Sequence, residues 1–186
     1  MFMFNKSFEE MGIPSGYGFK ELVFSPVANA LVVQMQSAGN SWRPERLYFR
    51  QLSSDKYRNI GEPGDLTSQE FPFVHSSKPL LAYNSMQHRF TLDAQGEEQH
   101  SGDWDSLKLF NLELGVEIDS INEDNLHLPT GVVRGWISDI VAFGDSGLFV
   151  KAGLSKDRSR MDYVVAEVDV VQRSLKPIVT LPATFI

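Results

Sequence analysis

The sequence predicts an all-β fold of mostly antiparallel strands, and three observations support this prediction. Long apolar stretches with the 3.6-residue period of a helix are scarce. β-Branched and aromatic residues instead gather in short runs, which are bounded by Gly, Pro, Asn, Asp and Ser. The order of strand, turn and strand then recurs along the chain, and such alternation is typical of antiparallel sheets.

The first 18 residues precede the first repeat and alternate apolar and polar side chains before Glu9 and Glu10. They contain no continuous apolar stretch of about 7–15 residues and no small-residue cleavage site, so we expect no signal peptide. No part of the chain approaches the roughly 18 apolar residues that span a bilayer, so no membrane segment is expected either. We expect residues 1–18 to form a cap, as a strand or a short helix.

The first repeat covers about residues 19–62. Its first half, FKELVFSPVANALVVQMQ, reads as strand, turn and strand, with Pro26 to Asn29 in the turn. Its second half, ERLYFRQLSSDKYRNI, has the same form, with Ser53 to Asp55 between the two runs. Four strands are therefore expected in this repeat.

Two further repeats follow, at about residues 63–128 and 129–182. The second contains FPFVHSSKPLLAY and DSLKLFNLELGVEIDSI, and the third contains WISDIVAFGDSGLFV and DYVVAEVDVVQRSLKPIV. Leu47, Leu107 and Val164 occupy equivalent places at intervals of about 60 residues. We expect these three side chains, together with Leu109, to be buried between sheets.

Four strands that recur at this spacing are the plan of a β-propeller blade. The chain resembles WD-repeat and related bacterial propeller families at the segments FSPVANALVV, HSSKPLLAY, ERLYFRQLSS and DSLKLFNLELG. The resemblance implies about three four-stranded antiparallel propeller-like blades within a single domain over residues 1–186. The Trp104-Asp105 dipeptide is not part of it, because the WD dipeptide closes a strand and this one precedes a strand. A two-sheet β-sandwich with similar hairpins is the alternative.

Three blades leave a problem of closure. Closed propellers have 4–8 blades, and an open ring exposes sheet faces and strand edges. Two chains could form a six-bladed ring as a homodimer. Otherwise the chain is a partial propeller that residues 1–18 or a partner protein covers, and we favour a partner of some kind on that surface.

The composition excludes several classes of protein. The chain has no cysteine, so disulfides, thiolate zinc sites and cysteine nucleophiles are excluded, and a cytoplasmic location is expected. Its net charge of −7 argues against a nucleic-acid binder and favours a basic protein partner. Basic clusters at residues 43–50 and 156–160 lack interleaved aromatic residues, and we interpret them as solvated loop ends.

Residues 144–147, Gly-Asp-Ser-Gly, match the tetrapeptide around the nucleophilic serine of chymotrypsin-like proteases. None of the four histidines has the sequence context of that family's base, and Leu148 stands where the family continues with glycine. The tetrapeptide joins the runs IVAF and LFVKAG, and its chemistry suits a hairpin turn. We therefore expect a turn with Gly147 at positive φ, and a protein that is not an enzyme.

The segment from His100 to Asp105 is the densest polar cluster in the sequence. A histidine with two carboxylates could bind a divalent metal, but the spacing matches no zinc or calcium pattern. We expect a polar insertion between strands, with no metal and no cofactor. The segment between Leu81 and Leu107 is longer than its counterparts in the other repeats, and extra length on a rigid scaffold often carries a binding surface.

The tryptophans supply the candidate binding residues. Trp136 falls in a strand pattern and is expected in the core. Trp42 and Trp104 fall in predicted polar loops, where an exposed large apolar ring indicates a binding surface. Trp and Arg dominate protein–protein hot spots. We therefore predict two binding patches, the first with Trp42, Arg43 and Arg46 and the second with Asp103, Trp104 and Asp105.

The leading hypothesis is a non-catalytic protein-binding module. A small, acidic, cysteine-free protein would suit an immunity or antitoxin role, in which it neutralises a basic partner. The alternative is a carbohydrate-binding module of propeller-like form, because sugars stack on tryptophan rings.

Overall fold

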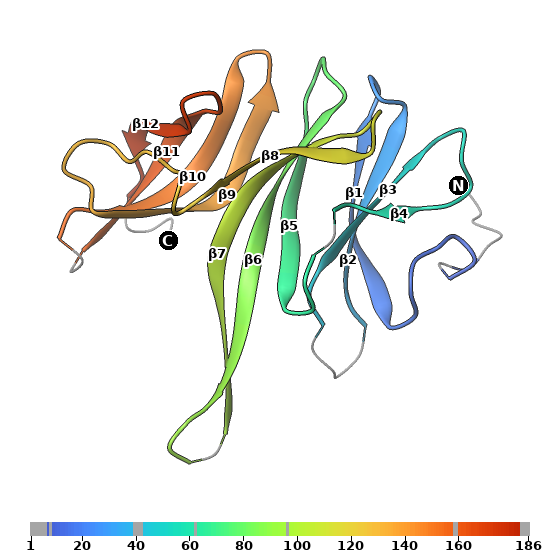
Figure 1. Ribbon diagram of the computed structural model, residues 1–186, viewed down its shortest axis with the longest axis horizontal. Coiled ribbons are helices and arrows are strands. Elements are labelled where there is room, and N and C mark those ends of the chain that lie inside the picture. The colour runs from blue at the N-terminus through green and yellow to red at the C-terminus, as the bar shows by residue number, and fades with distance from the viewer. Residues whose placement is uncertain are drawn as a thin grey trace.

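The computed structural model describes residues 7, 9–38, 43–61, 63–95, 97–157 and 160–182. Among these residues there are three four-stranded antiparallel sheets and no helix. We call them the first, second and third sheets in chain order. Consecutive strands pair within each sheet, and the second sheet lies between the other two (Figure 1). The predicted all-β, antiparallel fold is confirmed, whereas the alternative of two sheets in a sandwich is wrong.

Each sheet takes its strands from one continuous part of the chain. The first sheet contains β1 (Tyr17–Ser25), β2 (Ala30–Ser37), β3 (Arg46–Gln51) and β4 (Arg58–Asn59). The second sheet contains β5 (Thr67–Val74), β6 (Leu80–Leu92), β7 (Glu98–Asn111) and β8 (Val116–Asn122). The third sheet contains β9 (Arg134–Gly144), β10 (Gly147–Ser155), β11 (Met161–Asp169) and β12 (Ser174–Thr180). No described helix has the length and apolarity to cross a membrane.

Two hydrophobic cores fill the spaces between neighbouring sheets. The first core joins the first and second sheets, and in it the rings of Phe49 and Phe110 meet edge to face at 5.2 Å. The second core joins the second and third sheets through side chains such as Leu107, Leu109 and Val164. Leu47, which lies in the first core, is fully buried, and so is Leu107. Leu109 and Val164 are each 5% exposed. The predicted burial of these four residues is confirmed.

The first strand of each sheet is an edge strand, and its free edge is interrupted. β5 packs against the first sheet and β9 packs against the second. The pairing register shifts in each of these three first strands, at Phe19–Glu21 in β1, at Glu70–Phe73 in β5 and at two places in β9. In β5 the shift includes Pro72, which has no N–H to donate. Bulges and proline discourage the pairing of a further strand with these edges.

The described part of the N-terminal segment covers the outer face of the first sheet. Met11 and Ile13 are buried there against Val33, Met35 and Tyr48. The backbone of Met11 also accepts a hydrogen bond from Tyr57 N–H at 2.7 Å. Residues 9–18 therefore act as a cover for this sheet, although they form neither a helix nor, before Tyr17, a strand.

Candidate binding site

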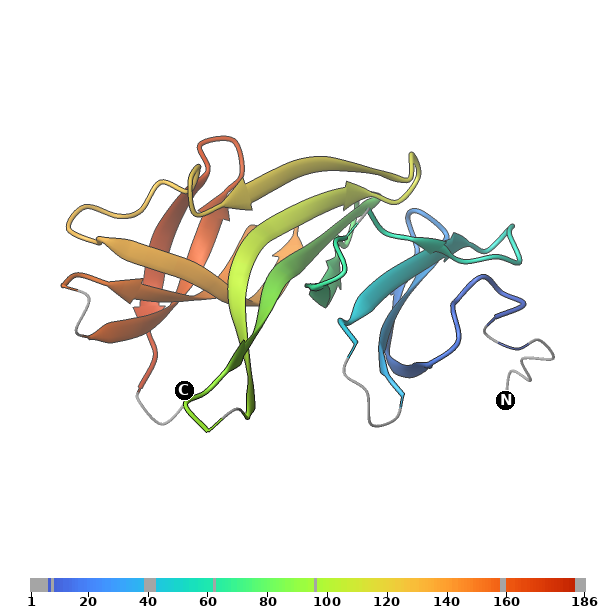
Figure 2. The same cartoon turned by 60° about the horizontal axis from the view of Figure 1, so that its bottom comes forward.

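The longest strands of the protein form a hairpin arm that projects from the second sheet. Beyond Gln87 the β5–β6 ladder ends, and before Ser106 the β7–β8 ladder has not begun, so the outer parts of β6 and β7 pair only with each other. Figure 1 and Figure 2 both show this hairpin extending away from the sheets. We call residues 88–105 the arm. The sequence predicted a polar loop here, and that prediction is wrong, because the extra residues are added as paired strand.

The tip of the arm is closed by a local hydrogen-bond network. The carboxylate of Asp93 accepts hydrogen bonds from the backbone N–H groups of Gln95 at 2.9 Å and Glu97 at 2.8 Å. The backbone of Asp93 also donates to the carbonyl of Glu97 at 2.9 Å. Aspartate commonly stabilises turns in this way. The described residues at the tip of the arm are therefore held together by hydrogen bonds.

A cleft of about 600 Å³ lies between the base of the arm and the start of β9. Met86 and Trp104 line it from β6 and β7, and Trp136 and Ser138 line it from β9. Its charged lining residues are Arg89, Asp103, Asp105, Glu123 and Arg134. The cleft thus contains all three residues of the second predicted patch and joins them to residues of the third sheet.

Trp104 lies on the side of the arm base that faces the third sheet. It pairs with Met86 across the hairpin and packs against the second core. The prediction of a polar loop around it is wrong, because it sits inside β7. Its indole nitrogen is buried and has no hydrogen-bond partner among the described residues. Leaving such a donor unsatisfied costs about 1–3 kcal/mol.

Asp105 is placed by a β-bulge. Ser85 pairs with Ser106 and Met86 pairs with Trp104, so Asp105 is the extra residue between them. The carboxylate of Asp105 accepts a hydrogen bond from Ser106 Oγ at 2.8 Å. Bulges re-aim side chains near functional sites. Here the bulge gives Asp105 access both to the cleft and to a smaller polar pocket of about 140 Å³.

The β9 side of the cleft contains an aromatic row that crosses the third sheet. Trp136, Gly153 and Tyr163 are in register on β9, β10 and β11. A Cβ at Gly153 would lie 2.8 Å from the Trp136 ring, so glycine makes room for the indole. The Arg134 guanidinium lies 5.7 Å from the centre of that ring. The prediction that Trp136 belongs to the core is wrong in part, because the ring is only half-buried and borders the cleft.

The charges of the cleft are only partly paired. Arg89 Nε lies 3.8 Å from Asp103 Oδ2, and both side chains are more than half exposed. Among the described residues, the carboxylates of Asp105 and Glu123 and the guanidinium of Arg134 have no ion pair within 4.0 Å. With three carboxylates and two guanidinium groups, the lining has one excess negative charge.

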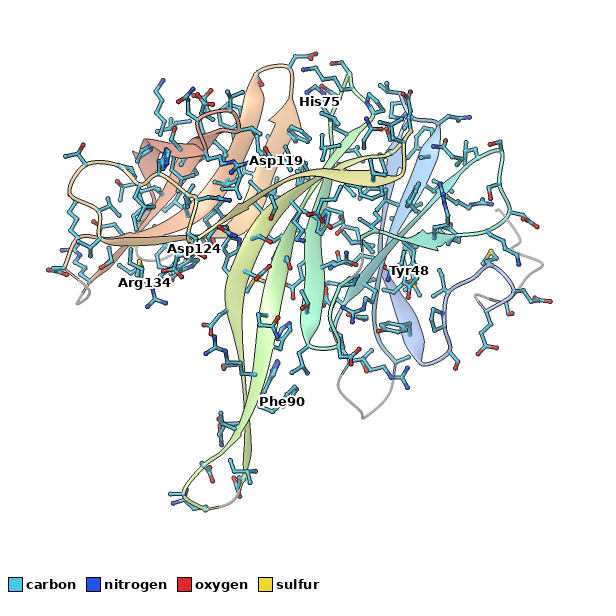
Figure 3. The ribbon with its side chains drawn as sticks, viewed as in Figure 1. Tyr48, His75, Phe90, Asp119, Asp124 and Arg134 are labelled. Carbon is cyan, nitrogen blue, oxygen red and sulfur yellow. The ribbon has the colours of Figure 1, made fainter. Side chains whose placement is uncertain are left out.

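The base of the arm is also held by two histidines. His88 Nδ1 lies 2.9 Å from His100 Nε2, and the two rings stack at 4.9 Å. The ring of Phe90 stacks on His100 at 4.8 Å and lies on the side of the arm away from Arg134 (Figure 3). His88 Nε2 also lies 2.7 Å from Ser68 Oγ on β5. Burial lowers the pKa of His88, and His100 adds to the lowering.

The first predicted patch is not assembled as expected. Trp42 lies outside the described residues. Arg43 is exposed, but its guanidinium donates to the carbonyl of Ser15 at 3.0 Å. Arg46 is only 8% exposed and donates to the carbonyls of Thr67 and Gly64, which joins the first sheet to the second. The interpretation of Arg46 as a solvated loop end is wrong.

The Gly-Asp-Ser-Gly segment forms the turn that was predicted. Asp145 and Ser146 connect β9 to β10, and Gly147 has a φ of 130°. Ser146 is exposed, and no hydrogen bond between it and a described histidine is present. His75, on the neighbouring β5–β6 turn, accepts a hydrogen bond from the Ser77 backbone at 3.1 Å. The turn itself thus contains no serine–histidine pair.

The described residues contain no candidate metal site. No group of three or more His, Asp or Glu residues among them could hold a metal ion. His100, Asp103 and Asp105, which the sequence brought together, all lie on β7 but do not converge on one point.

Among the charged and tryptophan residues that line the cleft, four were not predicted as binding residues: Arg89, Glu123, Arg134 and Trp136. Arg89 lies in the long segment between Leu81 and Leu107, whose extra length was the one signal that could have suggested it. Nothing in the sequence links the other three to Trp104, because they join it only when β9 packs against the second sheet.

Comparisons with known proteins show a likeness of fold alone. No protein-family model matches the chain, and no curated protein matches it. The crystal structure of Porphyromonas gingivalis dipeptidyl peptidase 4 is similar, with a TM-score of 0.54 and 14% sequence identity. The similarity covers 87% of this chain and 25% of the peptidase chain, so this chain spans about a quarter of that protein's length.

Proposed function

We propose that this chain is a non-catalytic protein-binding module that holds its partner with the arm and the cleft at its base. The observation that carries the proposal is the cleft itself, in which a tryptophan on the arm and a tryptophan on β9 border the same space. Aromatic residues beside paired charges are typical of protein–protein hot spots.

The scaffold of this module is three propeller-like blades. Three sequential four-stranded meanders, with a core between each pair of neighbours, support this arrangement. A scaffold of this kind fixes the base of the arm, because β6 and β7 continue from the middle sheet into the arm without a break. The middle sheet therefore positions the base of the arm before the partner binds, and such preorganisation lowers the conformational entropy that binding costs.

We favour a different protein as the partner, because the sheet face that a second copy of the chain would need is already covered. In a six-bladed homodimer, the third sheet of one chain would approach the outer face of the first sheet of the other. Met11 and Ile13 already occupy that face. The net charge of −7 favours a basic partner, as in an immunity or antitoxin-type protein of the cytoplasm.

A capture experiment tests this proposal. Asp103→Lys reverses an exposed charge on the cleft, and Glu113→Lys makes the same change on the exposed β7–β8 turn, away from the cleft. We expect the wild-type chain and Glu113→Lys to retain a stoichiometric protein from the source cell in gentle salt. Asp103→Lys should lose it while keeping the wild-type melting temperature.

A second variant tests the arm. Replacing residues 92–98 with Asn-Gly leaves Thr91 and Gln99, which already pair, joined by a turn that suits a two-residue hairpin. This variant should also lose the partner. If the wild-type chain retains no stoichiometric protein, or if both variants retain it fully, the proposal is wrong.

Carbohydrate binding is the second candidate, and the observation that favours it is the presence of two tryptophans and several carboxylates around one cleft. Quenching of tryptophan fluorescence by members of a glycan panel, lost in Trp136→Ala, would support it. The absence of quenching by every glycan would remove it.

A further inference from the structure

We propose that the cleft binds the guanidinium group of an arginine side chain that the partner inserts between the arm and β9. This inference rests on the proposed function and names the chemistry that the cleft recognises. It begins from the charges of the lining, where Asp105 and Glu123 have no ion pair among the described residues.

The negative side of the cleft is available to a cation from outside. Among the described residues, Asp105 accepts a hydrogen bond only from the hydroxyl of its neighbour Ser106, which leaves carboxylate lone pairs unused. Asp103 is held by Arg89 at 3.8 Å in an exposed pair, which stabilises by about 1 kcal/mol or less. A guanidinium from the partner therefore breaks only weak existing contacts when it approaches these carboxylates.

The two arginines of the cleft do not exclude this ligand. Arg89 lies beside Asp103, and Arg134 lies over the Trp136 ring at 5.7 Å. After these contacts the lining still has one excess negative charge. The contact between Arg134 and Trp136 also shows that a guanidinium fits against the indole ring on the β9 side of the cleft.

Arginine fits the lining better than lysine. A guanidinium is planar, stacks on aromatic rings and presents several N–H donors to carboxylates at once, whereas an ammonium is a compact and strongly hydrated charge. The cleft offers both kinds of contact, with indole rings on two walls and carboxylates from the bulge and from the segment after β8. Because the edge of β9 is bulged, the partner is not expected to pair with it as an added strand. The partner is therefore recognised through its arginine side chain.

The test uses three peptides that differ in one side chain: acetyl-Gly-Arg-Gly-amide, its lysine analogue and its citrulline analogue, which has the shape of arginine without the charge. Binding is followed by NMR through the indole N–H signals of Trp104 and Trp136. We expect the arginine peptide to shift both signals. We expect it to bind about tenfold more tightly than the citrulline peptide and more tightly than the lysine peptide.

Matched variants locate the interaction. In the double variant Asp105→Asn and Glu123→Gln, which keeps the size of both side chains, the arginine peptide should bind about tenfold more weakly. Glu113→Gln removes one exposed carboxylate far from the cleft and should leave the affinity unchanged. Equal binding of the arginine and citrulline peptides, no shift of either indole signal, or an equal loss in Glu113→Gln would each overturn the inference.

The outcomes separate this inference from the proposed function. If the chain retains a protein partner that Asp103→Lys loses, but the arginine peptide does not bind, only the inference is wrong. If the arginine peptide binds in the cleft but no protein is retained, the recognition chemistry stands and the protein-binding function fails.

Discussion

Ser77 Oγ donates a hydrogen bond to the carboxylate of Asp145. Ser77 lies in the turn between β5 and β6, and Asp145 lies in the turn between β9 and β10. The second and third sheets are therefore joined at the tips of their turns as well as through their shared core. The aspartate of the protease-like tetrapeptide thus serves a contact between sheets.

The contact between Ser77 and Asp145 should be measurable as a coupling energy. Both residues are exposed, so we expect a double-mutant cycle with Ser77→Ala and Asp145→Ala to give about 0.5–1 kcal/mol. Urea denaturation of the four proteins provides the measurement. Ser146→Ala, in the same turn, should change the free energy of unfolding by less than about 0.5 kcal/mol. A coupling energy of zero would mean that the two turns are independent.

Gly147 should be required for the backbone conformation of its turn. Its φ of 130° lies in a region that residues with a Cβ rarely adopt. We expect Gly147→Val to lower the free energy of unfolding by about 1 kcal/mol or more. Ser146→Val, one position earlier, serves as the control. Thermal melting that is the same for both variants would contradict the observed turn.

Truncation of the buried leucines should distinguish the two cores from the surface. Leu47 and Leu107 are fully buried, and each change to Ala should cost about 2–5 kcal/mol. Leu114 is 70% exposed, and its change to Ala should cost less than about 0.5 kcal/mol. Chemical denaturation measures all three. Similar costs at buried and exposed positions would contradict the assignment of the cores.

Stability should decrease as the pH falls below the ordinary pKa of histidine. Burial lowers the pKa of His88 in the folded protein below its usual 6.5, and the facing His100 lowers it further, although Glu45 opposes them. Below pH 6.5 the unfolded chain therefore binds a proton that the folded protein rejects, so the free energy of unfolding falls with pH. Glu70 acts in the opposite direction, because burial and Glu45 raise its pKa above 4.5.

Melting temperatures between pH 7.5 and 5.5 test this prediction. His88→Gln should reduce the loss of stability over this range, whereas His127→Gln, at an exposed position, should leave the loss as in the wild type. Burial also lowers the pKa of His75, which is unchanged in both variants and should leave part of the pH dependence in place. Identical pH profiles for all three proteins would contradict a role for His88.

Removal of the N-terminal cover should expose an apolar sheet face. Ile13 is 1% exposed and packs in the cluster that contains Val33 and Met35. We expect Ile13→Asp to lower the melting temperature and to cause self-association, since large exposed apolar patches favour association. The wild-type chain should sediment as a monomer at micromolar concentration. A wild-type dimer would favour closure by a second copy instead of a partner.

The strands and turns were predictable because their signals are local. In the first sheet, Pro26 to Asn29 close a hairpin between β1 and β2, as predicted, and Asn29 has the positive φ that asparagine tolerates. The burial of Leu47 and Leu107 followed from the repeat alone. Each of these predictions depends on neighbouring residues or on a fixed period, which one sequence contains in full.

The sequence by itself determined three groups of four antiparallel strands and the turn at residues 144–147, and it predicted a binding patch around Trp104, which stays a prediction. Only the tertiary structure decided that the segment around Trp104 is a paired arm, that Arg46 is buried between two sheets, and that Trp136 shares a cleft with Trp104. The physical reason is the range of the interactions. Hairpins form between residues that are close along the chain, whereas the cleft arises from the packing of one sheet on another, which no local pattern specifies.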